Sequence, residues 1–243
     1  IFCNVRGSGT GALTEKGLSI KEQLKSGIQW AKKRYGAKKF IAYFQSYTNT
    51  YAPISHLKEL YDLALSLPNI VGLSVATRPD CVNEDVLNLL ASYNKDYLIW
   101  LEMGLQSSHS RTLSLINRGH DVIAFENAVR LAYKKGIDIC AHVILGLPNE
   151  TRNDMIRTAI YLSNIPVQGI KIHLLYIVKG SRLAEIYARG AYRCLEMKEY
   201  VDILIEFIEH LRPDIIIHRL TGDPHRNELI APLWALKKNE VLA

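Results

Sequence analysis

The sequence lacks the features that mark membrane proteins and disulfide-stabilised secreted proteins. No apolar stretch of the 243-residue chain reaches the roughly 18–20 residues that a membrane-spanning helix needs, and no secretory signal is visible. Cysteine is scarce and scattered, and no Cys-x-x-Cys pair occurs among the four cysteines, Cys3, Cys81, Cys140 and Cys194. These absences predict a protein of the reducing cytoplasm that has no membrane partner and no disulfide framework.

Low-complexity tracts, short repeats and interior linkers are also missing, which favours one continuous core. The hydrophobic fraction of 48% and the charged fraction of 22% are ordinary for a globular protein. The net charge of +6 permits a nucleic-acid partner without requiring one. We interpret the lysine clusters as solvated helix ends.

Apolar runs typical of buried strands alternate with amphipathic segments typical of helices. The runs predict strands at 39–45, 70–77, 98–101, 137–145, 169–177 and 214–218. Helical spacing predicts helices at about 19–31, 54–67, 84–93, 122–135, 152–164 and 196–211. Right-handed βα units of this kind form a parallel sheet, so we predict an α/β protein with a closed or partly closed sheet. Residues 221–243 are predicted to be irregular and to cover one end of the fold.

The most informative polar residues are Glu102, Gln106 and Arg118, which lie along one strand-loop-helix passage at 100–121. The carboxyl ends of parallel strands are where ligands bind. A buried carboxylate is costly unless it is paired, so Glu102 either forms an ion pair or faces a cavity. Gln106 and Arg118 suit a helix cap and a helix end. Alternatively, the three residues bind a zwitterion, with arginine on its carboxylate.

Two histidines, His142 and His173, lie on two different predicted strands. A strand histidine is usually a hydrogen-bonded lining group. With Glu102, however, the two imidazoles also suit a metal-dependent barrel hydrolase. The two-residue strand period places Lys171 on the same face as His173. The residues predicted to contact a substrate are Lys171, His173, Lys179, His218 and Arg219.

Five short motifs follow one another along the chain. Cys3-Asn4 precedes Thr77-Arg78-Pro79-Asp80, Gly104-Leu105-Gln106-Ser107, Asn117-Arg118-Gly119-His120 and Ile144-Leu145-Gly146-Leu147-Pro148. Their order and spacing resemble those of the radical S-adenosylmethionine (SAM) enzymes, whose cluster-binding motif ends in Cys-x-x-Cys-Asn. The resemblance covers nearly the whole chain. It is greatest to the YhcC/YtqA-type branch, which is related to elongator-type tRNA-modifying enzymes.

The resemblance implies a partial (β/α)6 TIM-like barrel of parallel strands over residues 1–220, with residues 221–243 as a C-terminal extension packed on the barrel. The first strand and most of the cluster loop are expected to precede residue 1. The implied chemistry is reductive cleavage of SAM by a [4Fe-4S] cluster, which gives a 5′-deoxyadenosyl radical. A reductant such as flavodoxin or ferredoxin would supply the electron, and tRNA is the suggested substrate.

The resemblance also assigns roles to individual residues. Cys3 would bind the cluster, Arg118 and Gln106 would hold the methionine carboxylate, and Glu102 would bind the methionyl amine or ribose hydroxyls. Gln45 stands where relatives carry Gly-Gly-Glu. The residues assigned to the SAM pocket are Gln45, Glu102, Gln106, Arg118, His142, Leu147, Pro148 and Ile177.

The cluster motif is represented in this sequence by Cys3 alone. Cys81 and Cys140 are interpreted as small buried side chains rather than as substitute ligands. A SAM-binding module without radical chemistry is therefore a second alternative, beside the metal-dependent hydrolase.

Overall fold

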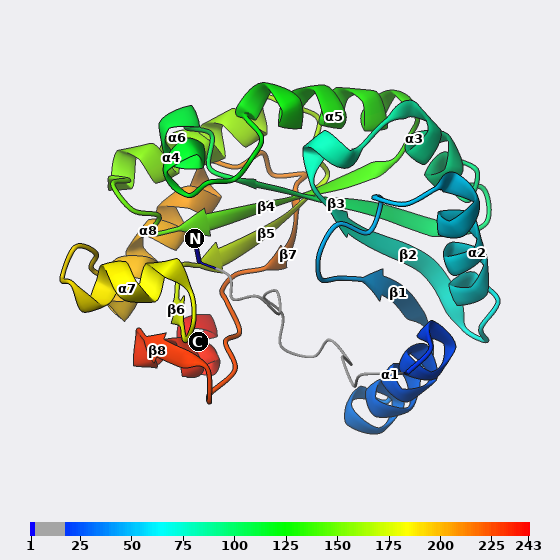
Figure 1. Ribbon diagram of the computed structural model, residues 1–243, viewed down its shortest axis with the longest axis horizontal. Helices are drawn as coiled ribbons and strands as arrows, with labels where there is room; N and C mark the ends of the chain where they lie inside the picture. The colour runs from blue at the N-terminus through cyan, green and yellow to red at the C-terminus, as the bar shows by residue number, and fades with distance from the viewer. Residues whose placement is uncertain (3–17) are drawn as a thin grey trace.

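The computed structural model describes residues 1–2 and 18–243 of the chain. Its centre is a curled sheet of six parallel strands in the order β1-β2-β3-β4-β5-β7 (Figure 1). These strands are β1 (Phe40–Phe44), β2 (Ile70–Thr77), β3 (Leu98–Gln106), β4 (Asp138–Leu145), β5 (Gly169–Leu174) and β7 (Ile216–Arg219). The predicted α/β fold, a partial barrel of parallel strands, is confirmed.

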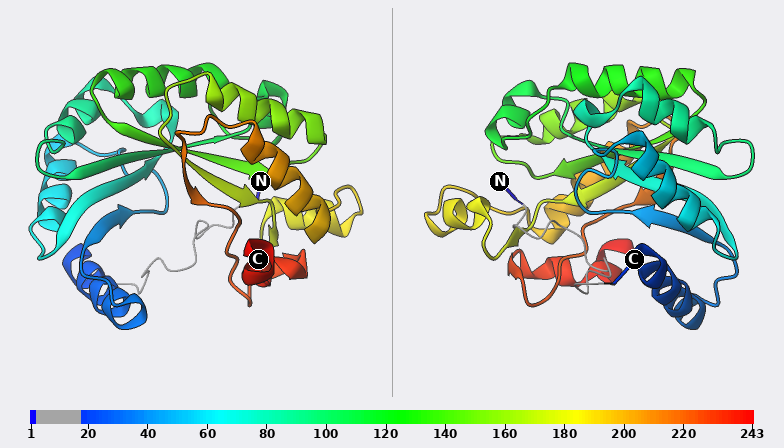
Figure 2. Two further views of the ribbon diagram at one scale, coloured as in Figure 1. Left: turned by 180° about the vertical axis from the view of Figure 1, so that it is seen from behind. Right: turned by 45° about the vertical axis from the view of Figure 1, so that its right-hand side comes forward.

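Helices cover the convex face of the sheet, and the concave face opens on the other side (Figures 1 and 2). The covering helices are α2 (Ile54–Leu65), α3 (Glu84–Ala91), α5 (Val122–Lys134), α6 (Arg152–Ser163) and α8 (Met197–Glu209). α1 (Ile20–Tyr35) lies beside β1, the end strand of the described sheet. Two short helices, α4 (Ser110–Leu115) and α7 (Arg182–Ala188), follow β3 and β6 (Ile177–Val178).

Ordinary capping groups mark where several helices begin and end. Asn83 and Asp121 accept hydrogen bonds from the first turns of α3 and α5, and Thr151 forms a capping box with Asp154 at α6. Gly36 ends α1 in the left-handed conformation that glycine adopts without steric cost. Each βα unit is therefore delimited by local sequence.

Alternation along β3 separates the core from the site. Leu101, Met103 and Leu105 are fully buried in the main hydrophobic cluster, against the helices. Because successive strand residues point to opposite faces, Glu102 and Gly104 face the concave side. Apolar packing thus stabilises the convex face, while polar groups line the interior of the half-barrel.

Two local predictions differ from the structure. The strand predicted at 169–177 ends at Leu174, and β6 pairs antiparallel with β8 (Leu229–Ala231) in a second sheet. The tail is not irregular, because it forms β8, the 3-10 helix η2 (Leu233–Leu236) and α9 (Lys238–Leu242). The Trp234 indole donates to the Leu195 carbonyl at 3.0 Å and anchors the tail. Within the described ranges, every helix is too short or too polar to traverse a bilayer.

Candidate functional site

At the carboxyl end of β3, the Gln106 amide and the Arg118 guanidinium both lie close to Gly104. The Arg118 Nη2 donates to the Gly104 carbonyl at 3.2 Å. A Cβ at Gly104 would lie 2.3 Å from both Arg118 Nη2 and Gln106 Nε2, so only glycine leaves room for both polar groups. Gln106 itself has a φ of 71°, a strained value for a residue with a side chain. The structure therefore brings together Gln106 and Arg118, as the sequence predicted.

His120 orients the Arg118 side chain. The Arg118 Nε donates to His120 Nε2 at 2.9 Å, and His120 Nδ1 lies 3.1 Å from the Asp121 carbonyl. Burial and the nearby Arg118 charge lower the pKa of His120, so its ring is neutral. The neutral ring then donates from Nδ1 and accepts at Nε2, which fixes the plane of the guanidinium.

The Thr77-Arg78-Pro79-Asp80 motif supports the same loop from the neighbouring strand. Arg78 forms two hydrogen bonds with Asp80, at 2.9 and 2.7 Å, at the 3-10 helix η1 (Pro79–Cys81). Its Nη2 also donates to the Gly119 carbonyl at 3.4 Å. Gly119 has a φ of 78°, and a Cβ there would lie 2.9 Å from that same nitrogen. Arg78 thus holds the turn that carries Arg118.

Glu102 lies two residues before Gly104 and is the centre of a buried polar cluster. Its carboxylate accepts from the Tyr43 hydroxyl at 2.9 Å, from His142 Nε2 at 2.7 Å, and also from Ser74 and Lys171. Glu102 is 3% exposed and Lys171 is 8% exposed. The ion pair that a buried carboxylate requires is therefore formed with Lys171.

The charges in this cluster follow from burial and pairing. Burial alone would raise the pKa of Glu102, but the hydrogen bonds and charges of His142 and Lys171 outweigh burial and hold that pKa well below its usual range. Burial lowers the pKa of His142 and, more strongly, that of His173. At neutral pH the cluster thus holds one carboxylate, one ammonium and two neutral imidazoles. Because a carboxylate can only accept, the His142 Nε2 carries the proton.

The predicted hydrolase triad is not assembled. In the described part of the chain, the residues whose ligand atoms lie within 4.8 Å of one another are Glu102, Cys140 and His142, and His173 is not among them. The His142 and His173 ring centroids are 5.6 Å apart. The Lys171 ammonium already pairs with Glu102, and burial raises the pKa of Cys140, which keeps its thiol protonated. This donor set suits a structural ion pair better than a divalent cation.

An apolar cluster lies beside the polar groups, at the carboxyl ends of the strands. Leu147 and Ile177 belong to it, and Ile1 and Phe2 pack against it. The nitrogen of Ile1 donates to the carbonyl of Ile116, the C-cap of α4, at 3.2 Å, and the Ile1 carbonyl accepts from the Leu183 N–H in α7 at 3.0 Å. Cys3, which follows Phe2, lies outside the described residues. The backbone leading to Cys3 is therefore anchored next to two of the predicted pocket residues.

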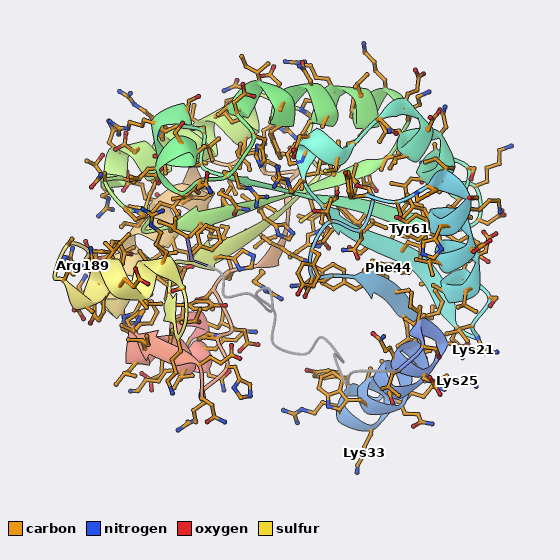
Figure 3. All side chains as sticks on the ribbon, in the orientation of Figure 1. Lys21, Lys25, Lys33, Phe44, Tyr61 and Arg189 are labelled. Atoms are coloured by element: carbon orange, nitrogen blue, oxygen red, sulfur yellow. The ribbon has the colours of Figure 1, made fainter. Side chains whose placement is uncertain are left out.

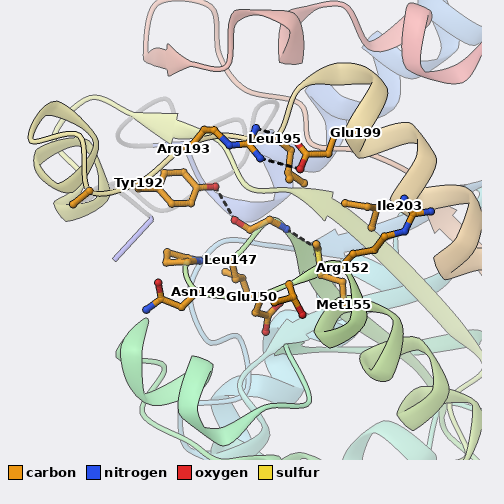
Figure 4. A pocket seen from close by; sticks show the side chains of 14 residues that line it. Leu147, Asn149, Glu150, Arg152, Met155, Tyr192, Arg193, Leu195, Glu199 and Ile203 are labelled. Carbon is orange, nitrogen blue, oxygen red and sulfur yellow. Dashed lines mark hydrogen bonds and ion pairs between the residues drawn. The ribbon is translucent and has the colours of Figure 1, made fainter.

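A pocket of about 380 Å³ lies where β4 passes into α6 (Figure 4). Leu147 and Pro148 line it, together with Tyr192, whose hydroxyl donates to the Gly146 carbonyl at 2.7 Å. The Gly146 N–H donates to the Met155 sulfur at 3.1 Å, so the turn is held from both sides.

The remaining predicted residues fall in three places. Gln45 directly follows β1. Arg219 pairs in register with Lys171, and the His218 ring meets the Trp100 ring edge-on at 4.4 Å, so both lie near the concave face. Lys179 is exposed at the turn after β6, apart from the others.

Sequence reasoning missed four residues of the site. Tyr43 and Ser74 bind Glu102 but come from strands distant in sequence, which no local pattern reveals. Glu150 accepts a hydrogen bond from the Ser107 hydroxyl and ties the turn before α6 to the end of β3. His120 could have been found from the Arg-x-His spacing.

Comparison with known proteins matches the chain to models of a protein family. Residues 1–162 match the model of the radical SAM superfamily, and residues 167–243 match that of the radical SAM C-terminal domain. The chain is 42% identical over 227 residues to the uncharacterized protein MJ0486 of Methanocaldococcus jannaschii, covering 93% of this chain and 70% of that protein. It is 40% identical over 243 residues to the uncharacterized protein YtqA of Bacillus subtilis, covering 99% and 74%.

Among solved structures, archaeal Elp3 from Methanocaldococcus infernus has the same fold, with a TM-score of 0.76 and 18% identity. The match covers 87% of this chain and 55% of the archaeal one, so the chain spans about half of that protein.

Proposed function

Because this chain belongs to the radical SAM superfamily, we propose that the end of β3 holds the methionine part of SAM beside a [4Fe-4S] cluster that Cys3 helps to bind. Members of this family are enzymes that use both cofactors. When bound, the two groups would supply one-electron reductive cleavage of SAM into methionine and a 5′-deoxyadenosyl radical, which is the chemistry for abstracting a hydrogen atom. A low-potential donor such as flavodoxin or ferredoxin supplies the electron.

The observation that carries the proposal is the convergence on Gly104. A carboxylate is recognised by a planar guanidinium whose orientation is already set, and His120 and Gly104 set that of Arg118. The Gln106 amide adds a donor next to it. The residues present therefore fit the amino-acid end of SAM.

The apolar cluster supports the other half of the proposal. Leu147 and Ile177 are buried in this cluster and would form the apolar backing of the adenine side, and Pro148 lines the adjacent pocket with Leu147. Ile1 and Phe2 bring the chain to this surface immediately before Cys3. Excluding water here protects a reactive radical from side reactions.

The Glu102 cluster supports a role beneath SAM. Glu102 and Gly104 share one face of β3, about 6.6 Å apart at 3.3 Å per residue. Glu102 and His142 are bonded to each other and form the floor of the site. Lys171 holds the Glu102 carboxylate in place. His173 and Arg219 then face the substrate, with Gln45 at the end of β1.

The substrate proposed is tRNA. The Thr77-Arg78-Pro79-Asp80 motif resembles the elongator-type branch, and the chain carries a net charge of +6. In this protein the motif positions the Arg118 turn, so it supports SAM binding rather than contact with RNA. The proposal that the substrate is tRNA therefore depends on the positive charge of the chain.

Anaerobic reconstitution of the full-length protein with iron and sulfide tests the proposal. We expect the visible absorbance of an iron-sulfur cluster, and 5′-deoxyadenosine when SAM and a reductant are added. If the protein binds SAM but forms neither the cluster nor 5′-deoxyadenosine, it is a SAM-binding module. That result would refute the proposed radical chemistry. Mass spectrometry of digested tRNA tests the substrate separately.

A further inference from the structure

The net charge of the chain is concentrated on α1 and the turn that follows it. Residues 18–41 contain seven basic residues and one acidic residue, a net charge of +6. The whole chain also carries +6, so the other residues together are neutral. We name as the α1 basic surface the residues Lys21, Lys25, Lys32, Lys33, Arg34, Lys38 and Lys39. Figure 3 shows Lys33 projecting away from the body of the molecule.

These seven side chains are exposed, and none of them forms an ion pair with an acidic residue of the described chain. Several other exposed cations have close acidic partners, as Arg130 has Glu126 at 2.7 Å and Lys198 has Asp202 at 2.8 Å. The α1 basic surface is therefore a region of uncompensated positive potential, which attracts a polyanion.

Exposed aromatic rings lie among these cations. Trp30 is 60% exposed and Tyr35 is 67% exposed, and their rings meet edge-on at 5.4 Å. The Arg34 guanidinium lies 5.8 Å from the Tyr35 ring centre. Interleaved cations and exposed rings are what proteins use to hold phosphates and to stack unpaired bases.

We propose that the α1 basic surface binds RNA, with its lysines and Arg34 on phosphates and with Trp30 and Tyr35 stacking on unpaired bases. The apolar side of α1, at Leu24 and Ile28, packs against the core, which leaves no apolar face to insert into a membrane. α1 stands at the β1 edge of the sheet, on its open side, so bound RNA borders the concave face (Figures 1 and 2). The inference deepens the proposed function by locating where its substrate docks.

The test uses the full-length protein and fluorescently labelled unfractionated tRNA, titrated over about 0.05–0.2 M salt. Each phosphate contact to a single strand contributes about 0.7 to the salt slope. Replacing Lys32, Lys33 and Arg34 by alanine is expected to lower the slope by about 2 and to weaken binding roughly 50-fold at about 0.15 M salt. Trp30→Ala is expected to weaken binding roughly 5- to 150-fold with the slope unchanged.

A matched control removes three other exposed charges that form no ion pair within the described residues, at Lys134, Arg157 and Arg189. Alanine favours helices, so circular dichroism should show both triple variants folded. Equal loss of binding in the control would overturn the proposal, as would binding of the wild type to phosphatidylglycerol vesicles but not to tRNA.

Binding is measured without SAM or reductant, so the two proposals fail separately. RNA binding through α1 without 5′-deoxyadenosine formation would sink the proposed function alone. Formation of 5′-deoxyadenosine with tRNA affinity unaltered in the α1 triple variant would sink the docking surface alone.

Discussion

Gly104→Ala should weaken the binding of SAM while leaving the sheet intact. The new methyl group would lie 2.3 Å from Arg118 Nη2 and Gln106 Nε2, whereas ordinary contacts begin at 3.4 Å. Both nitrogens must therefore retreat by about 1 Å, which should break the proposed hydrogen bond to the carboxylate of SAM. A hydrogen bond to a charged group contributes about 1.5–3 kcal/mol, so the dissociation constant for SAM should rise roughly 10- to 150-fold.

The assay is equilibrium dialysis of SAM against the anaerobically reconstituted protein, with thermal melting alongside. Gly190→Ala is the control, because a Cβ there meets no atom within 4 Å. Its φ of 70° makes alanine strained, so the control should lose some stability but no SAM affinity. Unchanged affinity in Gly104→Ala would refute the assignment of this cradle to SAM.

Three further results are expected. Lys171→Met leaves the Glu102 carboxylate buried without its ammonium, so thermal melting should show a midpoint lower by roughly 6–20 °C, and adding Glu102→Gln should restore most of it. Stability should fall as pH drops from about 7 to 5, because His142 and His173 have lowered pKa values when folded and the unfolded chain binds protons below about pH 6.5. Chemical denaturation checks this, and replacing both histidines by glutamine should flatten the profile. His120→Ala removes the acceptor that orients the guanidinium, and should weaken SAM binding by roughly 2- to 10-fold in the same dialysis.

The parallel fold could be predicted because its signals are local. Uninterrupted apolar runs such as residues 98–101, at the start of β3, indicate buried strands, and caps such as Asn83 mark where helices begin. That Gln106 and Arg118 both approach Gly104 was also predictable, since only the short helix α4 separates them.

The rest depends on contacts between distant segments. The partners of Glu102 come from four other strands, and their convergence follows from strand register rather than from spacing in the sequence. The break after Leu174 has the same kind of cause, since β6 gains its partner, β8, from more than 50 residues later. Arg78 was assigned by resemblance to a motif, yet its function in the fold is to hold Gly119.

Binding and cleavage of SAM by the full-length Arg118→Ala variant test the central claim most directly. The wild-type protein should retain its cluster, bind SAM and release 5′-deoxyadenosine on reduction. The variant should keep the cluster absorbance and lose SAM binding, because the guanidinium held at Gly104 is gone. Undiminished SAM binding in Arg118→Ala, with the cluster intact, would contradict the account.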